Sequence, residues 1–350
     1  MIRAVGIDPG TLSIDVCGIA DGQIYLDRTW PTTDALSDAT AFLELLTGPG
    51  SPDLVVGPSG YGLPVQPARD VSEDNLSLAF LARPGEAGGI GGLRGLSRSL
   101  AASGLPVIYI PGVIHLDTVP RHRKLNRIDL GTADKVCSAV LAIHGQCTGL
   151  SREPEDVSFI LIEMGGAFTA GVCVERGQIT DGVGGTSGPI GWRAAGALDG
   201  EVAFLAGDIT KAALFQGGVS SLLERGPALR PLAIDAYVEG IVKTVRQLRC
   251  SAPSANEILL SGRNAADGEI RNRIAAQLSD VGPVRLLTGS AEHAKQGAEG
   301  AALLADGLAG GKTRRVVDRL RVREARGTVL DSLVFITPEA ARKQLGLQHV

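Results

Sequence analysis

The amino-acid sequence predicts an α/β protein built from two similar halves, and three observations support this. The chain has 350 residues, which is more than one ordinary hydrophobic core holds and suits two domains. Apolar stretches of strand length alternate with longer stretches of helical periodicity. Each half opens with a strand, a glycine turn and a hairpin, as IDPGTLSIDVCGIADG in the first and IEMGGAFTAGVCVERG in the second. Two such halves facing each other would form a cleft, a common place for a ligand.

Short strands open the first half. They are expected at residues 3–7, 14–20 and 23–26. The dipeptide Asp21-Gly22 between the last two is a strong hairpin signal. A helix, a buried strand, a second helix and another strand follow at residues 35–46, 53–56, 95–103 and 105–110. The polar segment 111–127 comes next, and the spacing of apolar residues predicts a helix that begins near Thr132.

The second half repeats this order. Its first three strands are expected at residues 159–162, 169–174 and 178–180. Later strands are expected at residues 257–260 and 284–287. Helical periodicity covers residues 201–214, 234–249, 269–278 and 294–308. The remaining tail, residues 314–350, is charged and carries no clear pattern.

Composition excludes several classes of protein. With 44% hydrophobic and 21% charged residues, the chain resembles a soluble globular protein. The formal net charge of −4 gives no general attraction to nucleic acid or anionic lipid. No segment approaches the ~20 apolar residues of a membrane span, and no signal peptide is visible. The five cysteines form no CxxC pair, which favours reduced thiols. We expect a cytoplasmic protein that binds neither nucleic acid nor a membrane.

The first glycine turn carries residue types that hold magnesium and phosphate. Asp8, at the end of a strand, can hold Mg²⁺ through water. Gly10 and the hydroxyls of Thr11 and Ser13 can face a phosphate. The alternative is a simple polar turn, because Asp, Pro and Gly favour turns in any case. The matching turn in the second half favours phosphate.

At the second glycine turn, Gly165 and Gly166 stand side by side, with Thr169 close behind. Paired glycines leave backbone N–H groups bare, and bare N–H groups bind phosphate. Glu163 precedes them and can hold metal through water. The alternative is a tight hairpin, which would not require two consecutive glycines.

Taken together, these segments resemble the actin, hexokinase and acetate kinase superfamily. In detail they are similar to the butyrate kinases and to relatives described as "predicted butyrate kinase". The similarity keeps its order over residues 1–310. The segments that carry it are LIEMGGAFTAGVCVERGQITD, GPIGWRAAG, VVGPSGYGLPV, NRIDLGTADKV, ILLSG and AEHAKQGAEGAALLADG.

The resemblance implies two duplicated ribonuclease H-like domains of the actin-like ATPase type, with an interdomain cleft. Residues 1–130 would form the acceptor domain and residues 131–310 the nucleotide domain, with the tail 311–350 packing back on the first. It also implies ATP and Mg²⁺ as cofactors and a homodimer. The loop Ser261, Gly262 and Arg263 would contact the adenosine.

The implied activity is ATP-dependent phosphoryl transfer to a small carboxylic acid. Asp8 and Glu163 would hold Mg²⁺ through water, and the glycine turns would hold the β- and γ-phosphates. Arg193 matches the arginine of the related motif GPFSPERAG and would hold the transferred phosphoryl group or the acceptor carboxylate.

The acceptor site is expected at the basic segment that follows the fifth strand of the first half, with Ser59 from the loop after the fourth strand. Ser59, His115, Asp117 and Arg127 are its candidate residues. A solvated basic loop is the alternative; a cleft wall that attracts an anionic acceptor is the favoured interpretation.

Two aspartates are candidates for the catalytic acid. Asp117 lies in LDT, like the Asp-Thr of acetate kinases, and Asp129 lies just before GTADK. A carboxylate acceptor needs no base, so the aspartate would position metal. A hydroxyl acceptor would need one of them to accept a proton.

The sequence departs from the acyl kinases at four places. Glu163 replaces a histidine, Ala167 a third glycine, Ser59 an arginine and Arg263 a second glycine. Exchanging a cation for an anion beside phosphate costs on the order of 1–4 kcal/mol unless Mg²⁺ lies between. Two alternatives therefore stay open: a kinase for a hydroxyl acceptor, such as a sugar or cofactor precursor, and a nucleotide-binding regulator without turnover.

Overall fold

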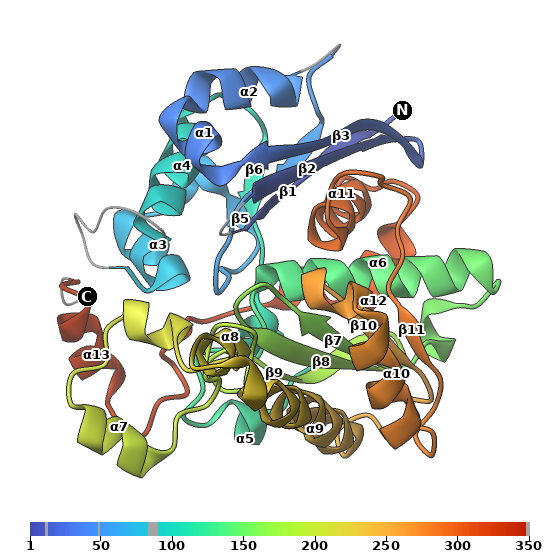
Figure 1. Cartoon of the computed structure of the whole chain (residues 1–350). Coiled ribbons are helices and arrows are strands. Elements are labelled where there is room, and N and C mark those ends of the chain that lie inside the picture. The colour runs from blue at the N-terminus through green and yellow to red at the C-terminus, as the bar shows by residue number, and fades with distance from the viewer. Residues whose placement is uncertain (11–12, 48–49, 83–89, 348–350) are drawn as a thin grey trace. The chain divides into compact units, whose positions relative to one another are not determined.

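The computed structural model describes residues 1–10, 13–47, 50–82 and 90–347 and divides into two compact units (Figure 1). Unit 1 comprises Met1–Ile128, Thr132–Glu155 and Thr288–Val350, and unit 2 comprises Asp129–Gly131 and Asp156–Leu287. These boundaries differ from the expected ones, because residues 132–155 and 288–310 belong to unit 1.

A six-stranded mixed sheet forms the centre of unit 1. Its strands are β1 (Arg3–Pro9), β2 (Ser13–Ala20), β3 (Gln23–Pro31), β4 (Leu54–Val56), β5 (Gln66–Pro67) and β6 (Val107–Tyr109). Their order is β3-β2-β1-β4-β6-β5. Strands β1 to β3 form an antiparallel meander, β4 and β6 run parallel to β1, and β5 is antiparallel at the edge. Asp21 and Gly22 both have positive φ, as the predicted hairpin turn requires.

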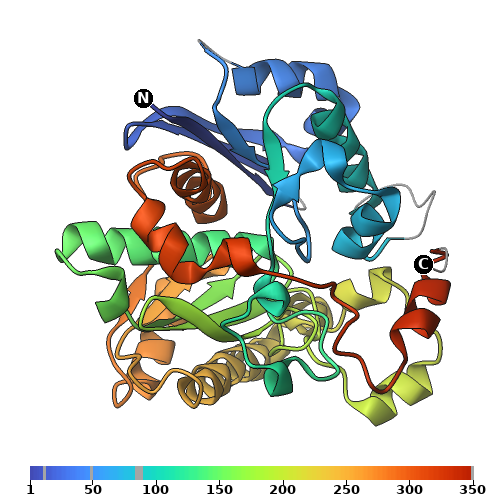
Figure 2. The ribbon, with the colours of Figure 1, turned by 180° about the vertical axis from the view of Figure 1, so that it is seen from behind.

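Helices cover both faces of this sheet (Figure 1). The helices of unit 1 are α1 (Thr32–Ser37), α2 (Ala39–Thr47), α3 (Glu73–Phe80), α4 (Ile90–Ala102), α5 (Arg121–Lys124), α6 (Ala133–Gly149), α11 (Gln296–Leu308), α12 (Arg314–Leu320) and α13 (Pro338–Gln344). The helix expected at 35–46 is divided at Asp38, which accepts a hydrogen bond from the Ala41 amide and so caps α2. Figure 2 shows α12 lying along α6.

The two faces of β1 pack differently. Val5 and Ile7 join the core with Phe42 of α2 and Leu100 of α4. Gly6 points the other way, because side chains alternate along a strand, and there it meets α11. A Cβ on Gly6 would lie 2.2 Å from the backbone nitrogen of Ala302.

Helix α11 also touches α6 through backbone. A Cβ on Gly300 would lie 2.0 Å from the carbonyl oxygen of Cys137. Small residues along α11 therefore let one helix lie against both β1 and α6, which is why residues 288–310 belong to unit 1 and not to the second half.

Unit 2 repeats the strand order of unit 1. Its strands are β7 (Phe159–Met164), β8 (Thr169–Glu175), β9 (Gln178–Val183), β10 (Ile258–Ser261) and β11 (Val284–Leu286). Their order is β11-β10-β7-β8-β9, with an antiparallel meander followed by two parallel strands. Register shifts occur at equivalent places, between Gly18 and Ile19 in β2 and between Cys173 and Val174 in β8. The predicted duplication is therefore present.

The helices of unit 2 are α7 (Gly200–Ala206), α8 (Val219–Glu224), α9 (Arg230–Arg249) and α10 (Gly268–Gln277). Helix α9 supplies Tyr237 and Ile241 to a core with Ile160 of β7. The helix expected at 201–214 was wrong in length: α7 stops at Gly207, whose φ is +71°, and it buries no residue. In the described parts of the chain, no helix has both the length and the apolar character to cross a membrane.

We expect Gly300→Ala to destabilise the protein, because its methyl group would meet the backbone of α6. Overpacking of this kind costs about 1–3 kcal/mol. The matched control is Gly145→Ala, at an exposed position of α6 where a Cβ meets nothing within 4 Å. That change should stabilise α6 by about 0.5–1 kcal/mol. Urea unfolding measures both, and equal effects of the two variants would contradict the packing described for α11.

Candidate functional site

The first glycine turn joins β1 to β2 and is closed by its own backbone. The amide of Gly10 donates to the carbonyl of Ser13 at 2.8 Å, and the Gly10 carbonyl accepts from the Thr32 hydroxyl at 2.9 Å. A Cβ on Gly10 would lie 2.7 Å from the Ser13 carbonyl oxygen. The Gly10 amide is thus engaged within the turn. Thr11 lies outside the described residues.

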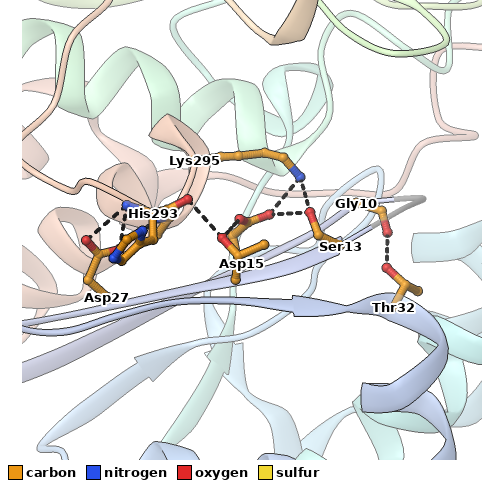
Figure 3. A network of polar contacts seen from close by, with 9 residues as sticks. Gly10, Ser13, Asp15, Asp27, Thr32, His293 and Lys295 are labelled. Atoms are coloured by element: carbon orange, nitrogen blue, oxygen red, sulfur yellow. Dashed lines mark hydrogen bonds and ion pairs between the residues drawn. The ribbon is translucent and has the colours of Figure 1, made fainter.

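A lysine from the start of α11 lies at this turn (Figure 3). Its ammonium, Nζ of Lys295, donates to Ser13 Oγ at 2.6 Å and to Asp15 Oδ2 at 2.7 Å. The Asp15 side chain is 1% exposed, whereas the Lys295 side chain is 48% exposed. A buried carboxylate needs such a partner, and here the partner also reaches solvent.

The loop that carries Lys295 is anchored to β3. The Asp27 carboxylate accepts hydrogen bonds from the three consecutive amides of residues 292–294, at 2.7–3.2 Å (Figure 3). Burial opposes ionisation of Asp27, but these backbone donors hold its pKa below the usual range. The Thr29 hydroxyl lies 2.8 Å from both the His293 carbonyl oxygen and Asp15 Oδ1. The backbone before α11 is therefore fixed beside the turn.

Asp8 ends β1 beside the start of α11. A Cβ on Gly297, in the first turn of α11, would lie 2.5 Å from Asp8 Oδ2, so only glycine fits there. A carboxylate beside a helix N-terminus is favourably placed in the field of the helix. Asp8, Gly10 and Ser13 thus lie together at the first glycine turn of unit 1.

The second glycine turn, between β7 and β8, has the same geometry. The Gly165 amide donates to the Phe168 carbonyl at 3.0 Å, the equivalent of the Gly10 bond. Asn264 Nδ2 donates to the Gly165 carbonyl at 2.7 Å. The Ala167 carbonyl accepts from the Arg193 amide at 3.0 Å. Gly166 is exposed at the tip, and a Cβ there would meet nothing within 4 Å.

Arg193 is placed beside this turn by aromatic contacts. Its guanidinium lies 5.9 Å from the ring centroid of Phe215. That ring meets Phe168 of the turn edge-on, with centroids 4.9 Å apart. A Cβ on Gly191 would lie 2.3 Å from the Ala167 carbonyl oxygen, so the loop before Arg193 runs directly over the turn. The Arg193 side chain itself is exposed.

Hydroxyl groups gather beneath the second turn. Thr169, Tyr237 and Ser261 are buried, and their hydroxyls have no partner at hydrogen-bond geometry among the described residues. Burial raises the pKa of Tyr237 to about 12. Thr169 and Ser261 are therefore under the turn and not at its surface.

The loop after β10 supplies the remaining nucleotide candidates. Ser261 pairs in register with Glu163 of β7, and Gly262 turns the chain with a φ of +85°. A Cβ on Gly262 would lie 3.1 Å from Glu163 Cγ. Arg263 is exposed. Glu163, Gly262 and the second glycine turn are thus neighbours in unit 2.

Several acceptor candidates are buried. The Ser59 hydroxyl donates to the Gly57 carbonyl at 3.0 Å and accepts from the Ile110 amide at 3.1 Å, so it holds two loops together. His115 is 2% exposed, and burial lowers its pKa to about 4. Asp129 is 8% exposed, belongs to unit 2 and accepts from the Gly131 amide at 2.9 Å.

Asp117 lies in a pocket of about 370 Å³ within unit 1. Arg121 and Lys124 of the basic segment line it with Asp117, and the C-terminal tail adds Arg326 and Asp331. Burial lowers the pKa of Lys124, although Asp117 acts in the opposite direction. Ser59, His115 and Arg127 do not line this pocket.

Two residues at the first glycine turn, Asp15 and Lys295, were not predicted as site residues, although each has a recognisable feature in the sequence. Asp15 is a lone charge inside an apolar strand, which indicates a buried ion pair. Lys295 directly precedes a helix of small residues. Their pairing joins positions 280 residues apart.

The residues present fit water-mediated magnesium better than a protein cage. Among the described residues, no three His, Cys, Asp or Glu side chains gather as a metal site. Magnesium usually keeps several waters and takes one or two carboxylates together with substrate phosphates. Asp8 in unit 1 and Glu163 in unit 2 each provide one carboxylate beside a glycine turn.

The buried His115 makes stability depend on pH. Its pKa is about 4 in the folded protein and ~6.5 when unfolded, so between these values the unfolded chain binds more protons. The free energy of unfolding should therefore fall by about 3 kcal/mol as the pH drops from 6.5 to 4. His115→Leu should remove this part of the slope, and the exposed His122→Leu should not. Urea titrations across this pH range measure it, and an unchanged slope in His115→Leu would contradict the assignment.

The fold is shared with solved kinases, whereas comparison with curated proteins gives no match. A propionate kinase from Francisella tularensis subsp. tularensis SCHU S4 is similar with 14% identity and a TM-score of 0.59, over 86% of this chain and 99% of that one. Acetate kinase from Entamoeba histolytica is similar with 13% identity and a TM-score of 0.56, over 79% and 86%. Acetate kinase from Porphyromonas gingivalis is similar with 13% identity and a TM-score of 0.56, over 80% of this chain and 88% of that one.

These likenesses confirm the predicted fold class, an α/β protein of the two-domain acetate kinase type. At 13–14% identity they establish the fold alone. The sequence itself matches one family over residues 6–335. The chain belongs to the family described as "Protein of unknown function (DUF1464)".

Proposed function

We propose that this protein is an ATP-dependent phosphotransferase whose acceptor is a small carboxylic acid. The observation that carries the proposal is the repeated glycine turn. In each unit the next-to-last residue of the first strand is a carboxylate, Asp8 or Glu163. The glycine two positions later closes the turn by a hydrogen bond to the residue three positions beyond it. Phosphoryl transfer relies on such positioning groups and on charge neutralisation. The fold shared with acetate and propionate kinases supports the proposal.

The residues of the two turns have separate tasks in this account. Asp8 in unit 1 and Glu163 in unit 2 would each be able to hold Mg²⁺ through water, and the ion would neutralise charge on the β- and γ-phosphates. The exposed backbone at Gly166 approaches a phosphate oxygen. Arg193, exposed beside the second turn, pairs with the transferred phosphoryl group or the acceptor carboxylate.

The acceptor binds in the pocket lined by Asp117. Three cations, Arg121, Lys124 and Arg326, surround it and attract a carboxylate, and its volume of about 370 Å³ admits a short acid. A carboxylate attacks phosphorus without losing a proton, so Asp117 only positions the acceptor.

A hydroxyl acceptor is the second candidate function, and the location of Asp117 favours it. Unlike Asp129, which is buried and bonded to the Gly131 amide, Asp117 is exposed at the pocket. It can therefore accept a proton from an alcohol.

The test is release of ADP from Mg²⁺–ATP over panels of short-chain acids, sugars and alcohols. Acid-dependent ADP release, with an acyl phosphate trapped by hydroxylamine, is the expected result. Release with a sugar or alcohol alone would establish the second candidate. Intact ATP binding with no acceptor-dependent release would leave a nucleotide-binding regulator.

Replacing Asp8 by Ala should weaken Mg²⁺–ATP binding by about tenfold or more, because it removes a charged hydrogen-bonding group from the phosphate. The exposed Asp34→Ala, in α1, is the matched control and should bind as the unchanged protein does. Calorimetric titration measures both. Full affinity in Asp8→Ala would show that this turn does not hold the metal–phosphate group.

Removing a cation from the pocket should raise the KM for the acceptor and leave the KM for ATP unchanged. Arg326→Ala tests the pocket, and Arg127→Ala tests an exposed arginine of the same segment that does not line it. We expect about a tenfold rise for Arg326→Ala alone. A rise for Arg127→Ala alone would move the acceptor site to Arg127.

A further inference from the structure

Lys295 places a partly exposed ammonium group at the first glycine turn. Its Nζ contacts Ser13 and Asp15 and would lie 3.0 Å from a Cβ on Gly10. An ammonium has three N–H donors, and these two contacts use two of them. With 48% of its side chain exposed, Lys295 can turn toward a ligand without any backbone movement.

The partner of Lys295 can release it. Asp15 accepts from the Ser13 hydroxyl at 3.0 Å and lies 2.8 Å from the Thr29 hydroxyl (Figure 3). Both hydroxyls belong to the same sheet as Asp15 and stay in place when the lysine moves. The buried carboxylate therefore keeps hydrogen-bond donors, which a buried charge requires.

The backbone of Lys295 is held in a position that favours anions. Residues 292–294 are bound to Asp27, and Lys295 itself is the N-cap of α11, a helix of 13 residues. The N-terminus of a helix carries partial positive charge, so it adds to the attraction of the ammonium. Lysine and helix end converge on the turn that ends β1.

We propose that Lys295 is the phosphate-binding residue of the first glycine turn and that it exchanges Asp15 for a phosphate oxygen when the ligand binds. That the ligand is the terminal phosphate of a nucleotide rests on the proposed function. The binding of a polyphosphate by Lys295 does not depend on the proposed function. In this account Asp15 competes with the phosphate for the same ammonium and so limits the affinity.

Substitutions of Lys295 and of Asp15 should then change the affinity for phosphate in opposite directions. Lys295→Gln removes the ammonium and should weaken binding about tenfold or more. Lys295→Arg keeps the charge and should restore most of the affinity. Asp15→Asn removes the competing charge and should strengthen binding about threefold or more, because the amide oxygen can accept from one of the two neighbouring hydroxyls and the amide nitrogen can donate to the other.

The matched control is Lys312→Gln. Lys312 makes a comparable pair with Asp21, 2.8 Å apart, at the far end of the same β2–β3 hairpin. The Lys312→Gln variant should bind tripolyphosphate and ATP with the affinity of the unchanged protein. Calorimetric titrations of the full chain with inorganic tripolyphosphate and with ATP, together with thermal unfolding of every variant, complete the experiment.

Each outcome separates this inference from the proposed function. Lys295-dependent binding of tripolyphosphate without ATP binding would support the inference and overturn the proposed function. Equal affinity of Lys295→Gln and the unchanged protein for ATP would overturn the inference and leave the function. Weaker binding in Asp15→Asn would show that the pair acts as one structural unit and would overturn the exchange. No binding of either probe would overturn both.

Discussion

The structure of unit 1 depends on the close approach of α11 to β1 and α6. Gly6 and Gly300 let backbone meet backbone at these two contacts, where even one methyl group would collide. This packing brings the start of α11 to the end of β1. As a result Gly297 meets Asp8 and Lys295 meets Asp15, although these pairs are far apart in the sequence. The candidate phosphate site thus depends on the small residues that let α11 lie close to β1 and α6.

The two units share the backbone arrangement of their first three strands and differ in the side chains beside the glycine turns. The two meanders share their order, their register shifts and turns closed by the same backbone bond. Their side chains differ. Unit 1 has the buried Asp15 with a lysine as partner, whereas Ala170 stands at the equivalent place in unit 2. There, Arg193 supplies the cation from a loop over the turn. One backbone plan therefore carries a lysine beside the first glycine turn and an arginine beside the second.

Local patterns predicted most of the fold. The Asp21-Gly22 hairpin, the repeated turn and the succession of strands along each half depend on neighbouring residues, and periodicity reveals them. Contacts between distant segments were not accessible in this way. Lys295 and Asp15 pair across 280 residues, and the tail completes the pocket at Arg326. His115 was expected to line the acceptor site and is buried instead, because surrounding apolar residues, and not its own sequence context, decide its burial.

The central claim is that the glycine turn of each unit binds phosphate, and hydrogen exchange with and without Mg²⁺–ATP tests it most directly. We predict slower exchange in peptides spanning 6–16 and 162–170, together with the segment 290–298 that carries Lys295. Amides that close the turns, such as those of Gly10 and Gly165, should gain protection because a bound phosphate restrains both ends of the turn. Slower exchange in only one of the two turns, or in neither, would contradict the account.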